Sequence, residues 1–239
     1  MGNENSITTR WEATREQVAA AAAACGRDPD AILILAVSKT FPLAAVEAAW
    51  QAGARHFGEN YVQEAVAKIE ACDLADIHWH FIGPLQSNKT RDVATHFDWV
   101  HTVERQKIAR RLHNQRPPEA PPLQVCLQVN ISADPNKAGL APEAVLPLAE
   151  DVAVLDRLTL RGLMTIPALE QSEAELSRDF ARMQTLFGQL QARYPQVDTL
   201  SMGMSDDLAL AIAHGSSCVR IGRGIFGPRT TTSTVTHRA

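Results

Sequence analysis

The stretch AILILAVSKTFP, residues 31–42, places Lys39 just after a run of aliphatic residues. Such a run is typical of a strand that is buried on both faces. A lysine at the end of a buried strand must reach water, pair with an anion, or do chemistry that needs an amine. Desolvation lowers the pKa of a lysine and makes its amine a nucleophile toward aldehydes. A solvated lysine is the commoner case, so both interpretations of Lys39 stay open.

The stretches SMGMSDD (201–207) and RIGRGIFG (220–227) suggest a site for an anion. A helix that begins at Ser205 or Asp206 would present free backbone N–H groups to it. Gly222 and Gly224 would let backbone amides approach an anion closely. The alternative is that Ser205 only caps a helix and that the glycines only form a tight turn. The sequence of these stretches supports the two interpretations equally.

Arg220 lies between Val219 and Ile221 in the last apolar segment. A buried arginine needs a partner, because an uncompensated interior charge costs on the order of several kcal/mol. That partner could be an acidic side chain or a ligand. A strand-end lysine, an anion-binding turn and an internal arginine together describe a site for pyridoxal 5'-phosphate (PLP). Lys39 would hold the aldehyde as a Schiff base, backbone amides would hold the phosphate, and Arg220 would face the pyridine nitrogen.

The elements that must position these residues alternate regularly along the chain. Strands are predicted near 32–38, 54–58, 77–83, 97–101, 123–131, 158–164, 197–202 and 217–221. Helices are predicted near 11–25, 43–52, 60–70, 87–94, 104–113, 142–155, 173–192 and 206–214. The clearest helix, 173–192, is preceded by Ser172 and carries Glu175 as the second half of a capping box.

Alternation of strands and helices implies parallel strands joined by right-handed crossovers. Eight such units in 239 residues fit a single (β/α)8 barrel of the TIM type with an extra N-terminal helix. The alternative is an open doubly wound sheet, but no GxGxxG motif follows the first strand. Barrels place their sites at the C-terminal ends of the strands, which is where the lysine, glycine and polar residues concentrate. We expect one domain over residues 1–229 and a flexible polar tail over 230–239.

Composition narrows the class of protein. The formal net charge is −4, which gives no general electrostatic attraction to nucleic acid or anionic membranes. Four widely spaced cysteines form neither a disulfide framework nor a zinc motif. The polar N-terminus does not resemble a secretory signal, and no apolar stretch is long enough to span a bilayer. We expect a cytoplasmic monomer, and we expect the basic residues of 105–111 to form a solvated helix face.

Six motifs resemble, in order, those of the pyridoxal phosphate homeostasis proteins: AVSKT, FGENYVQE, WHFIGPLQSNK, GLMTI, SMGMSDD and RIGRGIFG. They extend from about residue 31 to residue 228. The resemblance implies a barrel like the N-terminal domain of alanine racemase, with PLP on Lys39. It implies further cofactor-binding residues as well: Asn60 and His80 on the rim, Met202 in the pocket wall, Arg220 at the pyridine nitrogen, and Ser205, Gly222 and Arg223 at the phosphate.

Arg223 departs from the resemblance, because a small hydroxyl residue is usual at its position. The backbone amide of Arg223 could still donate to the phosphate. Its guanidinium could either add a charge-assisted contact or point to solvent.

An arginine opposite the pyridine nitrogen cannot hand the ring a proton, so the ring is a weak electron sink. Related racemases add a tyrosine base from a second domain, whereas this sequence holds only Tyr61 and Tyr194 and ends at residue 239. We therefore favour a protein that buffers PLP and supplies it to PLP-dependent apo-enzymes. One alternative is a PLP-dependent racemase or lyase, with His80 as the best candidate base. Another is a barrel enzyme that acts on a phosphorylated metabolite without a cofactor.

Overall fold

The structure, a computed structural model, describes residues 6–168 and 170–228. Eight parallel strands form a closed barrel in the order in which they occur along the chain. Leu33 of the first strand lies opposite Cys218 of the last, and this pairing closes the ring. The strands are β1 (Leu33–Val37), β2 (His56–Glu59), β3 (His78–Phe81), β4 (Trp99–Val103), β5 (Leu123–Val129), β6 (Leu158–Thr165), β7 (Thr199–Ser201) and β8 (Cys218–Ile221). The predicted barrel is therefore confirmed.

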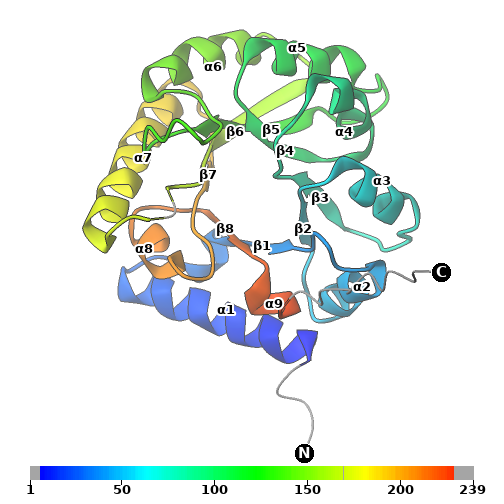
Figure 1. The fold of residues 1–239 in the computed structure, drawn as a ribbon, viewed down its shortest axis with the longest axis vertical. Coiled ribbons are helices and arrows are strands. Elements are labelled where there is room, and N and C mark those ends of the chain that lie inside the picture. Colours follow the sequence, from blue (N-terminus) through cyan, green and yellow to red (C-terminus); the bar gives the residue numbers. More distant parts are fainter. Residues whose placement is uncertain (1–5, 169, 229–239) are drawn as a thin grey trace, which may run out of the picture.

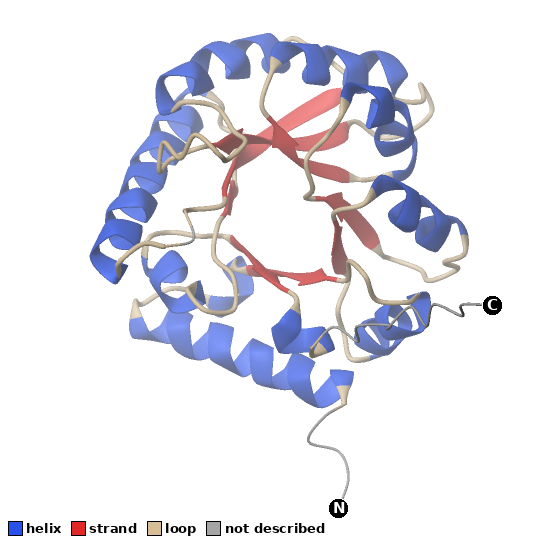
Figure 2. Cartoon of the chain, viewed as in Figure 1, coloured by secondary structure: helices blue, strands red, loops and turns tan. Residues whose placement is uncertain are grey.

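Helices surround the barrel as an outer ring (Figures 1 and 2). The α-helices are α1 (Ile7–Ala24), α2 (Leu43–Gln51), α3 (Val62–Glu70), α4 (Thr90–His96), α5 (Gln106–Gln115), α6 (Val145–Ala153), α7 (Glu173–Arg193), α8 (Leu208–Ala213) and α9 (Arg223–Phe226). Three 3-10 turns join them: η1 (Pro29–Ala31), η2 (Ser87–Lys89) and η3 (Pro142–Ala144). The extra helix α1 lies beside α8 and α9, outside β8 and β1 (Figure 1).

Helix boundaries follow the local capping chemistry. Helix α1 begins four residues before the predicted start, because Ser6 Oγ accepts a hydrogen bond from Thr9 N at 3.1 Å. The predicted capping box of α7 is present, with Ser172 and Glu175 bonded in both directions. Helix α8 begins at Leu208, later than predicted. The four-residue helix α9 was not predicted, because so short a helix has no apolar periodicity to read.

Side chains alternate between the inside and the outside of the barrel. Leu35 and Val37 of β1 pack with Ile82 and Cys218 in a small interior cluster. Ala36, between them, belongs to the larger apolar cluster that joins the barrel to its helices. Continuing this alternation past β1 assigns Lys39 to the same side as Val37, at the C-terminal mouth of the barrel.

No helix in the described ranges is long and apolar enough to cross a membrane. The predicted tail, residues 230–239, lies outside the described residues, and the domain limits of 1–229 stay a prediction.

Candidate functional site

Lys39 lies partly buried in the turn that follows β1. Phe41 N donates to Ser38 O at 3.1 Å and closes this turn. Thr40 has a φ of 67°, a left-handed conformation that β-branched residues rarely adopt. Such a conformation persists only where the surrounding structure holds it. The turn that carries Lys39 is therefore fixed by contacts from outside itself.

Part of that support is a buried ion pair behind the turn, on the helix side of the barrel wall. Ser38 Oγ and Lys68 Nζ both donate to Glu59 Oε1, each at 2.6 Å. Lys68 Nζ also donates to Ser38 O at 3.0 Å. Glu59 and Lys68 are both buried. Burial raises the pKa of Glu59, and the ion pair with Lys68 and the hydrogen bond from Ser38 oppose that rise.

A second carboxylate extends this group to the far side of Lys39. Glu64 Oε1 accepts a hydrogen bond from Thr40 N at 2.6 Å and lies 3.3 Å from Lys68 Nζ. We call Glu59, Glu64 and Lys68 the charged clamp. The clamp holds the residue before Lys39 and the residue after it, so it fixes the direction in which the turn presents the lysine.

The turn after β8 lies against the end of β1. A Cβ added to Gly222 would lie 3.5 Å from Val37 O, and one added to Gly224 would lie 3.6 Å from Ser205 Oγ. Gly222 is the N-cap of α9. Because the first N–H groups of a helix have no acceptor within it, those of Arg223 and Gly224 are available to a ligand. The structure thus brings the predicted anion-binding residues together beside the strand that leads to Lys39.

The side chain of Arg223 is 74% exposed. Its Nη2 lies 3.6 Å from Asp206 Oδ2, and Asp206 is itself 89% exposed. Of the two alternatives for this guanidinium, the structure shows the one that points to solvent. The backbone N–H of Arg223 is suited to an anion at the turn, and a contact of its side chain with a phosphate stays a prediction.

Arg220 is buried in the barrel interior. Its Nη1 donates to Ser201 O at 2.8 Å and to Ser201 Oγ at 2.9 Å, and its Nη2 donates to Thr165 O at 2.8 Å. Burial lowers the pKa of Arg220 from its ordinary value. Within the described part of the chain, these acceptors are neutral oxygens. A guanidinium carries five N–H groups, so two remain for a ligand.

Three histidines continue from Ser201 through the barrel interior. Ser201 Oγ lies 3.0 Å from His101 Nδ1, His101 Nε2 lies 2.9 Å from His80 Nδ1, and His80 Nε2 lies 2.9 Å from His56 Nδ1. We call His56, His80 and His101 the histidine wire. At its far end His56, together with Trp99, lines a cavity of about 960 Å³ between α1 and the N-terminal ends of the strands.

The histidine wire is uncharged near neutral pH. Burial, followed by the charge of Arg220, lowers the pKa of His101 to about 3. Burial, followed by His78, lowers the pKa of His56 to about 4. Burial also lowers the pKa of His80, and His101 adds to that shift. The cationic side chain of Arg220 therefore lies next to neutral imidazoles in the barrel interior.

The wire was not predicted from the sequence, and His80 was expected on the rim. The structure differs: His80 is fully buried on β3, where it pairs with Gly58 on one side and with Trp99 on the other. A signal was present in the sequence, because three successive predicted strands each carry a histidine at an inward position. Whether His80 contacts a cofactor stays a prediction.

Two further predicted site residues take different positions. Met202 is fully buried in the apolar cluster between barrel and helices, and this cluster is distinct from the small interior one. Asn60 follows β2, and a Cβ on Gly83 would lie 2.2 Å from Asn60 O, so their backbones are in close contact. Asn60 Oδ1 is buried without a hydrogen-bond partner in the described structure. That oxygen could accept a hydrogen bond from a ligand at the mouth.

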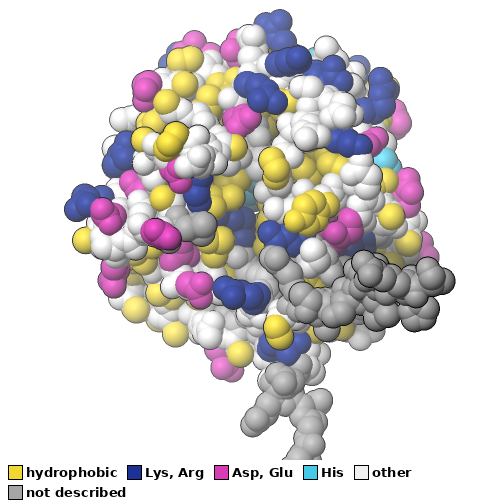
Figure 3. All heavy atoms as spheres, in the orientation of Figure 1, with side chains coloured by type: hydrophobic (Ala, Val, Ile, Leu, Met, Phe, Trp, Pro, Cys, Tyr) yellow, Lys and Arg dark blue, Asp and Glu magenta, His cyan; other side chains and the backbone are white. Residues whose placement is uncertain are grey.

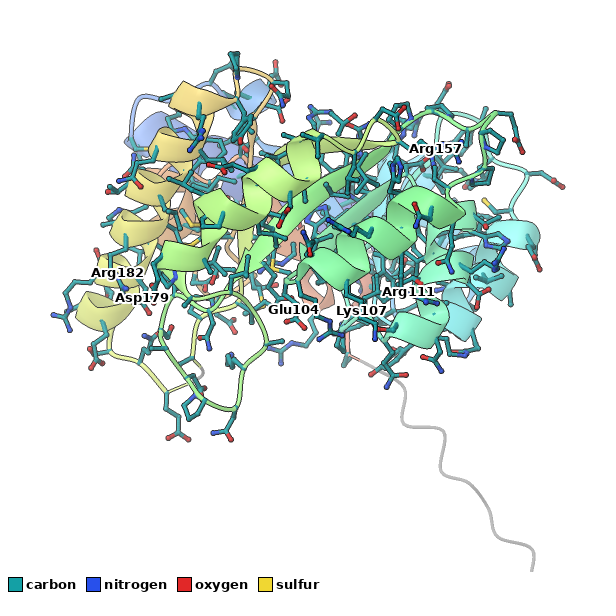
Figure 4. All side chains as sticks on the ribbon, turned by 90° about the horizontal axis from the view of Figure 1, so that it is seen from above. Glu104, Lys107, Arg111, Arg157, Asp179 and Arg182 are labelled. Atoms are coloured by element: carbon teal, nitrogen blue, oxygen red, sulfur yellow. The ribbon has the colours of Figure 1, made fainter. Side chains whose placement is uncertain are left out.

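The loops after β5 and β6 are held by the first turns of α7. Asp179 Oδ2 accepts hydrogen bonds from Ser132 Oγ at 2.6 Å and from Gln171 Nε2 at 2.7 Å. Arg182 Nη1 donates to Ile131 O at 2.8 Å. Figure 4 shows Asp179 and Arg182 beside each other near these loops. One buried carboxylate therefore ties two loops of the mouth to a single helix.

Basic side chains recur over the α4 and α5 side of the face seen in Figure 3. Arg105 pairs with Glu104 at 3.0 Å, and Arg111 Nε donates to Thr90 Oγ1 at 3.0 Å. Lys107 and Arg110 are exposed, and Figure 4 shows Lys107 and Arg111 on the same helix. These contacts are those of an ordinary solvated helix face.

Comparison with known proteins decides the family. Residues 11–230 match the alanine racemase N-terminal domain. The pyridoxal phosphate homeostasis protein of Escherichia coli (strain K12) is 51% identical over 228 residues, which cover 94% of this chain and 97% of that protein. The chain belongs to the pyridoxal phosphate homeostasis protein family. The resemblance of the six motifs is thereby confirmed.

Two further relatives agree. The Pseudomonas aeruginosa protein of the same name is 55% identical over 211 residues, covering 87% of this chain and 90% of that protein. A solved structure of PipY from Synechococcus elongatus with PLP bound has a TM-score of 0.81 and 39% identity, and covers 93% of this chain and all of that one.

Proposed function

We propose that this chain binds PLP on Lys39 and serves to buffer and supply the cofactor. The observation that carries the proposal is the convergence of three elements at one mouth of the barrel. The turn with Lys39, the glycine turn at Gly222 and the loop with Ser205 lie side by side there. Membership of a family whose relatives carry the name pyridoxal phosphate homeostasis protein supports it.

The residues fit the chemical groups of PLP. The amine of Lys39 would form the C=N bond with the aldehyde carbon, and the aldehyde oxygen would leave as water. The backbone N–H groups of residues 223 and 224 and the hydroxyl of Ser205 would donate to the phosphate. The two N–H groups of Arg220 that have no acceptor among the residues named above would face the pyridine nitrogen. That nitrogen can accept a hydrogen bond and remain unprotonated. Asn60 Oδ1 could accept a hydrogen bond from the ring substituents.

Arg220 also bears on whether the bound cofactor is turned over. When bound, PLP supplies an aldehyde for amines and an electron sink for carbanions. A guanidinium keeps its protons, so it leaves the ring nitrogen neutral and the sink weak. This chemistry favours holding and releasing PLP over catalysis on it. We further propose that the protein acts as a monomer in the cytoplasm and passes PLP to PLP-dependent apo-enzymes.

Absorption spectroscopy with borohydride reduction tests the attachment to Lys39. We expect a visible band with added PLP in the wild type, and a pyridoxyl adduct mapped to Lys39 after reduction. Lys39→Ala should lose both. Lys107→Ala, which removes an exposed lysine on α5, serves as the matched control and should keep both. A wild type that stays colourless with excess PLP would contradict the proposal and leave the cofactor-free barrel enzyme as the better interpretation.

Assays of the PLP-loaded protein then distinguish a carrier from a racemase or lyase. The loaded protein is mixed first with an apo-enzyme that needs PLP, and separately with L-alanine and other amino acids. A carrier restores the activity of the apo-enzyme and leaves the amino acids unchanged. Formation of D-amino acids or cleavage products at more than single turnover would favour the enzyme.

A further inference from the structure

We infer that His101 is a positioning residue, which fixes the guanidinium of Arg220 through the hydroxyl of Ser201. His80 and His56, the rest of the histidine wire, fix His101 in turn. The inference rests on the proposed function only in its purpose, because Arg220 is the side chain proposed to meet the cofactor ring. The hydrogen bonds on which it rests are present in the protein without cofactor.

The numbers of donors and acceptors along the histidine wire indicate which atom donates in each of its hydrogen bonds. Ser201 Oγ accepts one hydrogen bond from Arg220 Nη1, so its single proton is free to go to His101 Nδ1. His101 then carries its proton on Nε2 and donates to His80 Nδ1. His80 in turn donates from Nε2 to His56 Nδ1. Every ring nitrogen from His101 Nδ1 to His56 Nδ1 has a partner of the right kind, and His56 Nε2 carries its proton at the end of the wire, where His56 lines the cavity.

The reversed direction is less favourable at its end. Ser201 Oγ would then receive two donors, from Arg220 and from His101. Its own proton would be left to the sulfur of Cys218, the other side chain in contact with this hydroxyl and a weak acceptor. A buried donor without a good acceptor is costly, so the direction away from Ser201 prevails.

The wire cannot rotate freely, because its members are packed on several sides. The ring of Trp99 stacks on His80 at 5.1 Å between centroids and 12° between planes. His80 and His101 are fully buried. His56 also stacks on His78 at 4.6 Å. Rings held in this way keep His101 Nδ1 aimed at Ser201.

A neutral wire does something that a carboxylate could not do. An aspartate or glutamate beside Arg220 would also orient the guanidinium, but it would neutralise its charge. His101 supplies an acceptor to Ser201 without adding a negative charge. The hydrogen bonds thus orient Arg220, and its positive charge stays available to a ligand at the mouth of the barrel. This combination suits a ring nitrogen that must stay unprotonated.

Substitution at His101 separates positioning from packing. The side-chain oxygen of Asn can take the place of Nδ1 and accept from Ser201, whereas Leu fills similar space without an acceptor. We expect His101→Leu to weaken PLP binding about tenfold, the effect of losing a hydrogen bond in a charged network. His101→Asn should stay within about threefold of the wild type. A packing role would instead favour Leu over Asn, in step with the melting temperature.

The chain offers a matched control, because a second histidine–serine pair lies outside the barrel. His214 Nε2 is 2.9 Å from Ser177 Oγ, between α8 and α7. His214→Leu and His214→Asn should leave PLP affinity unchanged. Equal affinity of His101→Leu and wild type, or an Asn variant as weak as the Leu variant, would overturn the inference. A wild type that carries the Lys39 adduct in that same experiment shows that the proposed function itself has not failed.

A measurement on the protein without cofactor guards against variants that do not fold. In ¹⁵N-histidine NMR of the wild type we expect His101 and His80 each as a neutral Nε2–H tautomer, protected from exchange with solvent. Ser201→Ala should change the Nδ1 signal of His101 most and that of His214 not at all. The Nδ1–H tautomer at His101, or a charged ring near neutral pH, would overturn the inference.

Discussion

Lys39 and Arg220 face the same mouth, yet they are supported in opposite ways. Behind Lys39 lies the charged clamp, in which a buried lysine and two carboxylates hold the backbone on both sides of the turn. Below Arg220 lies the histidine wire, and the oxygens that accept hydrogen bonds from the guanidinium are neutral, while the carboxylate of Asp207 acts on Arg220 without a direct hydrogen bond. The clamp fixes main chain, where charge does no harm to the site. The wire fixes a side chain whose charge must survive, so it adds none.

The largest loss of unfolding free energy is expected when one partner of the charged clamp is removed. Lys68→Met leaves Glu59 buried and unpaired, which costs about 3–5 kcal/mol of unfolding free energy. Urea denaturation of the variant beside the wild type measures this loss. The double variant Glu59→Leu/Lys68→Met should recover most of it, because well-packed apolar residues can replace a buried ion pair. A single variant that loses less than about 1 kcal/mol would show that the clamp is not a coupled unit.

The histidine wire should make the unfolding free energy depend on pH. The folded-state pKa of His101, about 3, lies below the ordinary value of 6.5, so no penalty exists above pH 6.5. Below it, the unfolded chain binds a proton that the folded chain refuses. Each such histidine then lowers the unfolding free energy by about 1.4 kcal/mol per pH unit. His101→Asn should therefore show a shallower pH slope, gaining about 2 kcal/mol relative to wild type between pH 6.5 and 5.

Denaturation at several pH values checks this prediction, and Gly222→Ala is a useful contrast because it alters no titratable group. If wild type and His101→Asn show the same slope, His101 is not held neutral and the contrast between clamp and wire is lost.

The smallest effect on stability is expected from a substitution at Gly222. This residue lies in the turn after β8, against the end of the strand that leads to Lys39. A Cβ there would make ordinary contacts with Val37 and needs no positive φ. Gly222→Ala should change the unfolding free energy by less than about 0.5 kcal/mol. Its PLP affinity, measured by titration, should nevertheless fall several-fold if the phosphate occupies that space. A loss of stability without a loss of affinity would contradict the proposed phosphate position.

The barrel was predictable because strand and helix periods are local properties of the sequence. The order of polar strand ends then located Lys39, Ser205 and Gly222 at one mouth. The clamp was not predictable, because Glu59 meets Lys68 only through the packing of α3 on β2. The face of a residue such as Met202 depends on where the alternation of its strand begins, and an error of one residue reverses it. Register also decided that His80 lies inside the barrel and not on its rim.

Closure of the barrel through β1 and β8 has a consequence for synthesis of the protein. Leu35, four residues before Lys39, pairs with Arg220, which the ribosome adds 185 residues later. A growing chain that already contains Lys39 has neither the strand beside it nor the glycine turn until residues 218–224 emerge. Parallel pairings of such long sequence separation form late. The site proposed for PLP is therefore unassembled in the nascent chain and is complete only when the barrel has closed.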